Sequence, residues 1–193
     1  NHIQIDLADP NKTIEAIETI KAKVNGRVHA LVNNAGISPK GPGGARLDTL
    51  TTDLRTWGHV FHVNFFASVI LARGLQQELT AAKGSIVNVT SIAGSRVHPF
   101  AGAAYATSKA ALAALTREMA HDFGPLGVRV NAIAPGEVET SILSPGTEKI
   151  VAQLPMQRLG QPNEVADVIW FLCSDQSSYI SGAEVQVNGA QHV

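Results

Sequence analysis

Tyr105 and Lys109 are the two residues whose types and spacing best suit proton chemistry. They stand four positions apart in an Ala-rich stretch, 102–123, that predicts a helix, so both side chains lie on one helix face. A free phenol has a pKa of about 10 and is a poor base at neutral pH. A nearby ammonium lowers that pKa toward the range useful for general acid–base catalysis. The alternative is an ordinary surface tyrosine and lysine that share a face by chance.

Two further polar residues could assist such a centre. Ser91 directly follows a predicted strand, 85–90, and its hydroxyl could donate a hydrogen bond to a carbonyl oxygen on which charge develops; a turn serine is the alternative. The residues around Ser91 do not form a GxSxG motif, so a nucleophilic serine is not indicated. Asn64 lies in a predicted apolar helix, where a buried amide needs hydrogen-bond partners. It is either a satisfied core amide or a group that holds water or backbone near the centre.

The elements that must position these residues alternate along the chain between β-type and helical segments. Strands are expected at 3–5, 28–32, 85–90, 128–134 and 184–187, and helices at 10–24, 53–79, 102–123 and 162–173. Asp9 and Asp53 supply N-caps, and Pro10 suits a first helical position. Strands separated by such helices predict βαβ units and a parallel sheet covered on both faces. The sequence therefore predicts one α/β domain over 1–193, in which 137–160 is mostly loop.

Polar or glycine-bearing clusters directly follow four of the predicted strands. They are Asp6-Leu7, Asn33 to Gly36, Thr90-Ser91 and Pro135-Gly136. In an open parallel sheet, ligands bind beyond the carboxyl ends of the strands. Four such clusters on one edge predict a binding cleft there.

Composition narrows the possible classes of protein. The chain has 193 residues, of which 45% are hydrophobic and 16% charged, and its net charge is −1. That balance suits a globular domain without a basic surface, so neither nucleic acid nor a membrane is expected as a partner. The single Cys173 cannot form an intrachain disulfide, which fits a cytoplasmic location. No metal site is expected.

The polar motifs occur together in one order along the chain. They are Asn33-Asn34-Ala35-Gly36, Asn64, Ser91, Tyr105-Ala106-Thr107-Ser108-Lys109, Asn131, Pro135-Gly136-Glu137-Val138-Glu139-Thr140, Arg158-Leu159-Gly160, Ser181-Gly182 and Val187-Asn188-Gly189. In this order and spacing the chain resembles the short-chain dehydrogenase/reductase family over essentially its whole length. It looks most similar to the branch that contains the 3-oxoacyl-carrier-protein reductases. The resemblance implies a Rossmann-like, doubly wound parallel sheet.

The resemblance also implies roles at the matching positions. Tyr105 would be the general acid in reduction and the base in oxidation, while Lys109 would lower its pKa and bind the nicotinamide ribose. Ser91 would orient the substrate, and Asn64 would support a proton relay through water. The implied cofactor-binding residues are Asp6, Leu7, Asn34, Ala35, Gly36, Tyr105, Lys109, Pro135, Gly136, Val138 and Thr140. The cofactor would be NAD or NADP, and the residue that selects between them is not in this sequence.

One departure from the family pattern affects the fold. The glycine-rich phosphate loop of the family is absent from this sequence. By comparison with the family, the domain would lack its first βαβα portion, whose strands are central in a Rossmann sheet. We therefore expect strand 28–32 to pair only with 85–90, and 3–5 to be isolated or displaced. Asp6 and Asn34 would then face an open groove.

A second departure concerns the expected substrate pocket. Ser91 and Tyr105 are 14 positions apart, one more than a common family spacing, so the loop between them differs locally. The pocket is expected from the part of this loop around Arg96, Val97 and His98, together with segment 137–154. His98 is expected to face solvent, with substrate contact as the alternative.

The resulting hypothesis is an NAD(P)-dependent oxidoreductase that interconverts a carbonyl and an alcohol on a small-molecule substrate. A non-catalytic cofactor-sensing or scaffold protein on the same fold is the alternative, and the joint presence of the catalytic set favours the enzyme. The small side chains of 102–123 permit close helix approach, although high helix propensity also explains them. With the family resemblance, they predict a homodimer or homotetramer that packs this helix and 53–79 across a two-fold axis.

Overall fold

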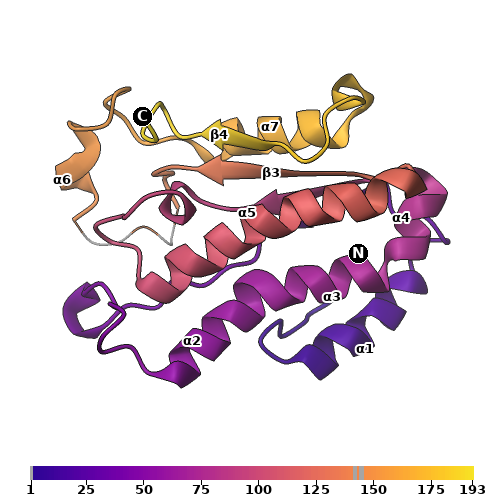
Figure 1. The fold of residues 1–193 in the computed structure, drawn as a ribbon, viewed down its shortest axis with the longest axis horizontal. Helices are drawn as coiled ribbons and strands as arrows, with labels where there is room; N and C mark the ends of the chain where they lie inside the picture. The colour runs from indigo at the N-terminus through magenta and orange to yellow at the C-terminus, as the bar shows by residue number, and fades with distance from the viewer. Residues whose placement is uncertain (1, 141–142, 144–145) are drawn as a thin grey trace.

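Four parallel strands form a single sheet in the computed structural model of the protein, which describes residues 2–140, 143 and 146–193 (Figure 1). The strands are β1 (Ala30–Asn33), β2 (Ser85–Val89), β3 (Arg129–Pro135) and β4 (Glu184–Val187), in that spatial order. Each neighbouring pair is parallel; Ser85, for example, lies opposite both Ala30 and Arg129. The expected Rossmann-like α/β fold is confirmed.

Helices connect the strands and cover the sheet. Those in the described residues are α1 (Pro10–Lys21), α2 (Leu54–Phe61), α3 (Ala67–Gly74), α4 (Gln76–Ala82), α5 (Ala103–Phe123), α6 (Glu148–Val151) and α7 (Pro162–Cys173). The Asp9 carboxylate caps α1 by accepting the amides of Asn11 and Lys12, as the sequence predicts. Where it is described, segment 137–160 is largely irregular apart from α6. No helix in these ranges is long and apolar enough to cross a membrane.

The two faces of the sheet pack against different helices. Successive side chains of a strand point to opposite faces. On one face Ile86 and Val130 belong to a core that includes Met119 of α5 and residues of α1, α3 and α4. On the other face Val87 packs in a second core with Leu172 of α7. Coverage of both faces explains why these strands read as apolar runs without clean alternation.

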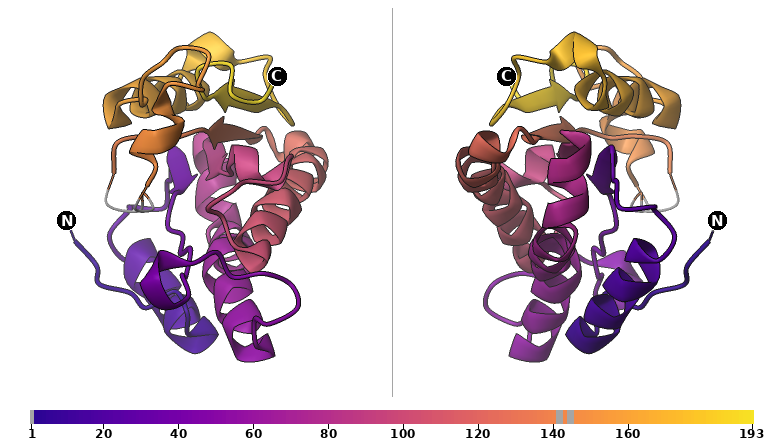
Figure 2. Two further views of the ribbon diagram at one scale, coloured as in Figure 1. Left: turned by 90° about the vertical axis from the view of Figure 1, so that its left-hand side faces the viewer. Right: turned by 90° about the vertical axis from the view of Figure 1, so that its right-hand side faces the viewer.

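β1 forms one edge of the sheet. It pairs with β2, and no strand among the described residues pairs with its outer side. Residues 3–5 form no strand, and the segment before α1 leads away from the sheet (Figure 2). The prediction that 28–32 pairs on one side only and that 3–5 is isolated is confirmed, although the strand itself runs from Ala30 to Asn33.

The single helix expected at 53–79 is broken into α2, α3 and α4. Asp53 caps α2 through the amide of Thr56, as predicted. A π-helical turn, His62–Phe66, separates α2 from α3 and contains the buried Asn64. Such turns occur frequently at functional sites. At the end of α3, a Cβ on Gly74 would lie only 2.2 Å from the Cδ1 atom of Ile17, so glycine allows α1 and α3 to pack closely.

Gly94 allows the turn after β2 to lie against α5, and we expect Gly94→Ala to destabilise the protein. A Cβ there would lie 2.8 Å from the amide nitrogen of Ala110 and 3.0 Å from the carbonyl carbon of Lys109, both backbone atoms. Overpacking of this kind costs about 1–3 kcal/mol. Urea unfolding of the variant measures the loss directly.

Gly58→Ala is the matched control for this prediction. Gly58 lies in α2, and nothing stands within 4 Å of the position its Cβ would take. Glycine inside a helix is less stable than alanine by about 0.5–1 kcal/mol, so the control should be neutral or stabilising. Equal stabilities of the two variants would show that the Gly94 contact does not constrain the fold.

Candidate active site

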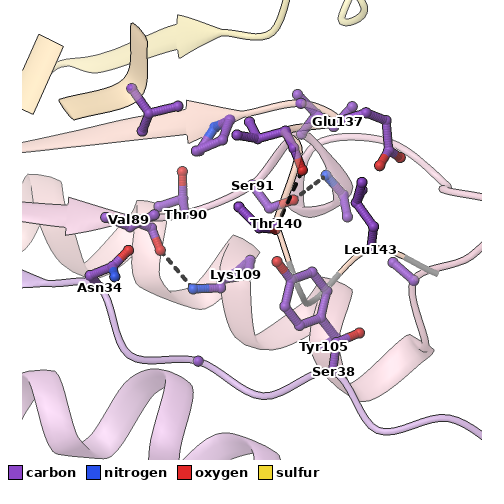
Figure 3. Close-up of a pocket in the computed structure, with 18 of the residues that line it drawn as sticks. Asn34, Ser38, Val89, Thr90, Ser91, Tyr105, Lys109, Glu137, Thr140 and Leu143 are labelled. Carbon is purple, nitrogen blue, oxygen red and sulfur yellow. Dashed lines mark hydrogen bonds between the residues drawn. The ribbon is translucent and has the colours of Figure 1, made fainter. Parts of the chain in front are cut away.

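The segments that follow β1, β2 and β3 meet at a cavity of about 470 Å³ (Figure 3). The first turns of α5 and one face of α7 complete its wall. Ser91, Tyr105 and Lys109 all line this cavity. The cleft expected at the carboxyl edge of the sheet is therefore present, and it contains the residues that the sequence singled out for proton chemistry.

Lys109 is a buried cation held against the end of β2. Its side chain is 3% exposed, and Nζ donates a hydrogen bond of 2.6 Å to the carbonyl oxygen of Val89. The same nitrogen lies 5.8 Å from the centre of the Tyr105 ring, as expected for neighbours on one helix face. Burial lowers the pKa of Lys109 to about 8. An ammonium has three N–H donors, so two remain for a ligand in the cavity.

The phenol of Tyr105 has a raised pKa. Burial is the main cause and the charge of Glu137 adds to it, whereas a hydrogen bond with the Ser91 side chain acts in the opposite direction. Lys109 is not among the causes, and its ammonium is bonded to Val89 instead. The pKa of Tyr105 is therefore raised by burial in this arrangement, and the expectation that Lys109 lowers it stays a prediction. Tyr105 holds its proton at neutral pH.

Ser91 lies just after the end of β2, and its side chain forms a hydrogen bond with the phenol of Tyr105. Its Oγ accepts a 3.2 Å hydrogen bond from the amide of Ala93 and so caps the short 3-10 turn Ile92–Gly94. It is therefore a turn serine, and it is also a serine whose side chain lines the cavity beside Tyr105. The two interpretations offered by the sequence are compatible.

Asn64 is a satisfied core amide that also fixes backbone next to the cavity. It is 1% exposed; Oδ1 accepts the amide of Ile37 at 2.8 Å, and Nδ2 donates to Ile37 O and Ser108 Oγ, each at 3.0 Å. Both amide hydrogens are thus occupied by protein atoms. Oδ1 keeps a second acceptor site, so the expected support of a proton relay through water stays a prediction. Asn64 holds the turn that carries Gly36.

The expected cofactor-binding residues divide into two groups. Those that line the cavity are Asn34, Gly36, Tyr105, Lys109, Pro135, Gly136, Val138 and Thr140. Asp6, Leu7 and Ala35 do not line it. Asp6 is exposed, and its carboxylate accepts the amide of Ala8 at 3.0 Å. The expectation that Asp6 and Asn34 face one groove is not met among the described residues, because the segment before α1 leads away from the sheet.

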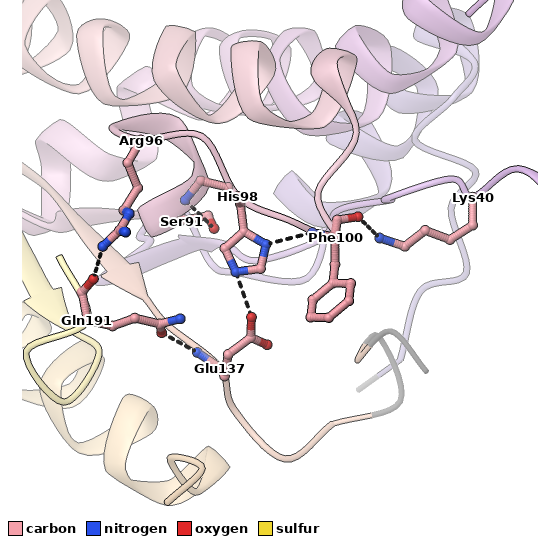
Figure 4. A network of polar contacts seen from close by, with 8 residues as sticks. Lys40, Ser91, Arg96, His98, Phe100, Glu137 and Gln191 are labelled. Atoms are coloured by element: carbon pink, nitrogen blue, oxygen red, sulfur yellow. Dashed lines mark hydrogen bonds and ion pairs between the residues drawn. The ribbon is translucent and has the colours of Figure 1, made fainter. Parts of the chain in front are cut away.

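His98 and part of segment 137–154 line the cavity, as expected for the substrate pocket, whereas Arg96 and Val97 do not. Sequence reasoning missed the polar cluster that His98 and Glu137 form with Lys40 (Figure 4). His98 is buried, and its Nε2 lies 2.7 Å from Oε1 of Glu137. The expectation of a solvent-facing His98 is therefore wrong. Lys40 lines the same cavity and donates to the carbonyl oxygen of Phe100 at 2.6 Å. The described residues contain no group of three or more His, Cys, Asp or Glu side chains placed to hold a metal ion.

Comparison with known proteins agrees with this geometry. The family model described as enoyl-(acyl carrier protein) reductase matches residues 1–192. Protein FixR of Bradyrhizobium diazoefficiens is 61% identical over the whole chain, which covers 70% of FixR. The 3-oxoacyl-[acyl-carrier-protein] reductase FabG of Aquifex aeolicus is 35% identical over 97% of the chain and 74% of FabG.

A solved structure gives the same result at the level of the fold. The crystal structure of a short-chain dehydrogenase/reductase from Brucella ovis, in complex with a partially ordered NAD, matches with a TM-score of 0.84. Sequence identity is 56%, and the match covers 97% of this chain and 78% of that one. The chain therefore belongs to the short-chain dehydrogenase/reductase family of oxidoreductases.

Proposed function

We propose that the protein interconverts a carbonyl and an alcohol with a nicotinamide cofactor, using Tyr105 as the proton donor or acceptor. The observation that carries the proposal is the convergence of Ser91, Tyr105 and Lys109 on one cavity of about 470 Å³ at the carboxyl edge of the sheet. A scaffold protein would not need these three groups together in a cavity. The similarity to 3-oxoacyl-[acyl-carrier-protein] reductase supports the same chemistry.

The proposed proton step follows from the environment of Tyr105. Because its pKa is raised, the phenol is protonated at neutral pH and can protonate the oxygen of a carbonyl that is being reduced. Ser91, which lines the cavity beside the phenol, would hydrogen-bond the same oxygen as negative charge develops on it. In the reverse direction Tyr105 must first lose its proton, which burial and Glu137 both oppose.

The cavity residues fit a nicotinamide dinucleotide, NAD or NADP. Lys109 keeps two N–H donors for ribose hydroxyls, and a Cβ on Gly36 would lie 3.4 Å from Lys109 Nζ, so glycine leaves this approach open. Val165 and Ile169 of α7 give an apolar wall opposite the strand ends. The cofactor would supply the hydride, while Pro135, Gly136, Val138 and Thr140 would border it. Asn64 would act by holding the turn that carries Gly36.

Turnover by full-length protein tests the proposal. NADH and NADPH are each offered with a panel of ketones, 3-oxoacyl thioesters and aldehydes, and loss of reduced cofactor is followed by absorbance. Turnover with at least one pair is the expected result. Cofactor binding without any turnover would instead favour the non-catalytic sensor or scaffold.

We also propose that the protein acts in the cytoplasm and that its partner is a small-molecule substrate.

We also propose that the protein is a homodimer or homotetramer built on α5 and the α2–α3 region. These helices lie side by side, and they expose Ala114 and Phe66, the latter by 45% (Figure 1). Light scattering of full-length protein at micromolar concentration should give a dimer or tetramer, and Ala114→Glu should shift it toward monomer. Wild-type protein that is only monomeric would rule this assembly out.

A further inference from the structure

A polar cluster formed by Lys40, His98 and Glu137 lines the catalytic cavity, and none of its members is the proposed proton donor or acceptor. These residues come from three separate segments: the loop after β1, the loop after β2 and the segment after β3 (Figure 4). Among the described residues of the cavity wall, the Lys, Arg, Asp and Glu side chains are Lys40, Lys109 and Glu137. The cluster therefore decides which charged or hydrogen-bonding groups the cavity accepts.

The hydrogen bonds of His98 define its role as a donor. The backbone amide of Phe100 points at Nδ1 from 3.3 Å, so Nδ1 accepts and the ring hydrogen is on Nε2. Nε2 lies 2.7 Å from Oε1 of Glu137, and both side chains are only 10% exposed. His98 thus donates to the carboxylate and fixes its orientation.

Glu137 is also fixed through its backbone. Its amide donates to Oε1 of Gln191 at 3.2 Å, and the guanidinium of Arg96 donates to the carbonyl oxygen of Gln191. The segment near the end of the chain therefore ties the loop that carries His98 to the segment that carries Glu137. These contacts fix the backbone of Glu137, while the contact with His98 fixes its carboxylate.

Among the described residues, Oε1 of the Glu137 carboxylate bonds to His98, and no hydrogen bond to the second oxygen, Oε2, is found. Because Glu137 lines the cavity, Oε2 is available to whatever occupies it. A carboxylate oxygen is a strong acceptor, and hydrogen bonds to charged groups contribute more than neutral ones. A ligand in the cavity that carries an N–H or O–H donor would satisfy this oxygen.

Lys40 balances the charge of Glu137 without pairing with it. Its ammonium donates to Phe100 O at 2.6 Å and forms no ion pair within 4 Å among the described residues. Burial lowers the pKa of Lys40, whereas the negative charge of Glu137 raises it. The two charged groups therefore interact electrostatically without direct contact. With His98 as a neutral donor, this wall has one positive and one negative group. This wall has no excess positive charge, and Lys109, the other cation of the cavity, is assigned to the cofactor in the proposed function.

We propose that the substrate carries a hydrogen-bond donor, a hydroxyl or an ammonium group, close to the carbon that reacts, and that Glu137, oriented by His98, accepts it. The inference rests on the proposed oxidoreductase function and adds the substrate class. Glu137 is then a specificity residue that distinguishes hydroxy- or amino-substituted alcohols and ketones from plain alkyl ones. Its place in the same cavity as Tyr105 puts the donor group within one small molecule's length of the reacting carbonyl.

A matched set of ring alcohols tests this specificity. Full-length protein with NAD and NADP is offered cyclohexanol, cyclohexane-1,2-diol, 2-aminocyclohexanol and 2-hydroxycyclohexanecarboxylate. A hydrogen bond to a charged acceptor changes selectivity by about 10- to 100-fold, so kcat/KM for the diol or the amino alcohol should exceed that for cyclohexanol by such a factor. The carboxylate compound should be no better than cyclohexanol. Equal values for the diol, the amino alcohol and cyclohexanol would overturn the proposal.

Two variants of Glu137 assign the preference to its carboxylate. Glu137→Leu should abolish the preference, which is a ratio of kcat/KM values and therefore does not depend on any change that the variant makes in the rate with cyclohexanol. Glu137→Gln, which keeps an oxygen acceptor but no charge, should retain preference for the diol and lose preference for the amino alcohol, so it distinguishes the two donors. Glu139→Gln is the control, since Glu139 is exposed, lies outside the cavity and accepts from Gln161. A preference that survives in both Glu137 variants contradicts the proposal.

A binding measurement separates failure of this inference from failure of the proposed function. If no alcohol is oxidised with either cofactor, the proposed function fails, and saturation-transfer NMR of the same four compounds then decides the specificity. Binding of the diol or the amino alcohol to wild type and its loss in Glu137→Leu would support Glu137 as the acceptor. Binding of all four compounds alike would overturn it. Thermal unfolding of each variant confirms that the protein measured is folded.

Discussion

Tyr105→Phe is expected to remove nearly all turnover while cofactor binding stays close to wild type. The variant lacks the hydroxyl that gives its proton to the substrate, and general acid–base groups commonly contribute about 10²- to 10⁴-fold to the rate. The ring remains in the cavity wall beside Lys109, whose 2.6 Å bond to Val89 O does not involve the phenol. Steady-state kcat and the single-turnover rate of the chemical step check the first part, and fluorescence titration of NAD(P)H affinity checks the second.

The control for this experiment is the other tyrosine of the chain. Tyr179 is fully exposed and does not line the cavity, so Tyr179→Phe should keep wild-type kcat. If Tyr105→Phe kept more than about a tenth of wild-type kcat with chemistry rate-limiting, another group would have to move the proton. Loss of cofactor affinity in Tyr105→Phe would point to disturbed packing rather than to a lost acid.

The regular elements could be predicted closely where local signals mark their ends. α7 begins at Pro162 and ends at Cys173, and β4 spans Glu184–Val187, as the sequence indicates. β1 starts two residues later than the predicted strand, which began at 28. The reason is that the amide of Val28 donates to Glu78 O instead of to a neighbouring strand of the sheet. The π turn at Asn64 could not be predicted, since its bonds to Ile37 and Ser108 join segments distant in sequence.

The cavity could be predicted only in part for the same reason. The spacing of Tyr105 and Lys109 within one helix is local information and placed both groups correctly. The raised pKa of Tyr105 could not be predicted, because its main cause is burial of the phenol, which the sequence does not show. His98 was expected in solvent because its partner Glu137 is 39 positions away, with no periodicity linking them. Glu137 beside Gly136, in a segment expected to line the pocket, was the available signal.

Lys109→Met is expected to change the pH dependence of stability as well as to impair catalysis. Lys109 is 3% exposed, and burial lowers its pKa from 10.5 to about 8. The folded state therefore releases this proton more readily than the unfolded chain. Below about pH 8 the lysine is charged in both states and the fold carries the full cost of burying the charge. As pH rises from about 8 toward 10.5, the unfolded chain retains the proton that the folded protein has lost, so stability rises.

The size of this effect follows from the two pKa values. One pKa unit corresponds to about 1.4 kcal/mol, so wild type should gain about 2 kcal/mol relative to Lys109→Met between pH 7 and about pH 9.5. The difference between the two proteins isolates Lys109, because all other titrating groups are shared. Urea unfolding at several pH values measures it, with Lys12→Met at an exposed position as the control that should show no such trend.

The same residue is expected to be needed for function at the pH where it weakens the fold. Its two free N–H donors would hold the cofactor, and loss of charged hydrogen bonds should lower cofactor affinity about tenfold or more. Buried, functionally required charges are typical of the trade-off between stability and activity. A stability difference that does not vary with pH would mean that the Lys109 pKa is unperturbed. Unchanged cofactor affinity in Lys109→Met would mean that the Lys109 ammonium does not bind the cofactor and only hydrogen-bonds Val89 O at the end of β2.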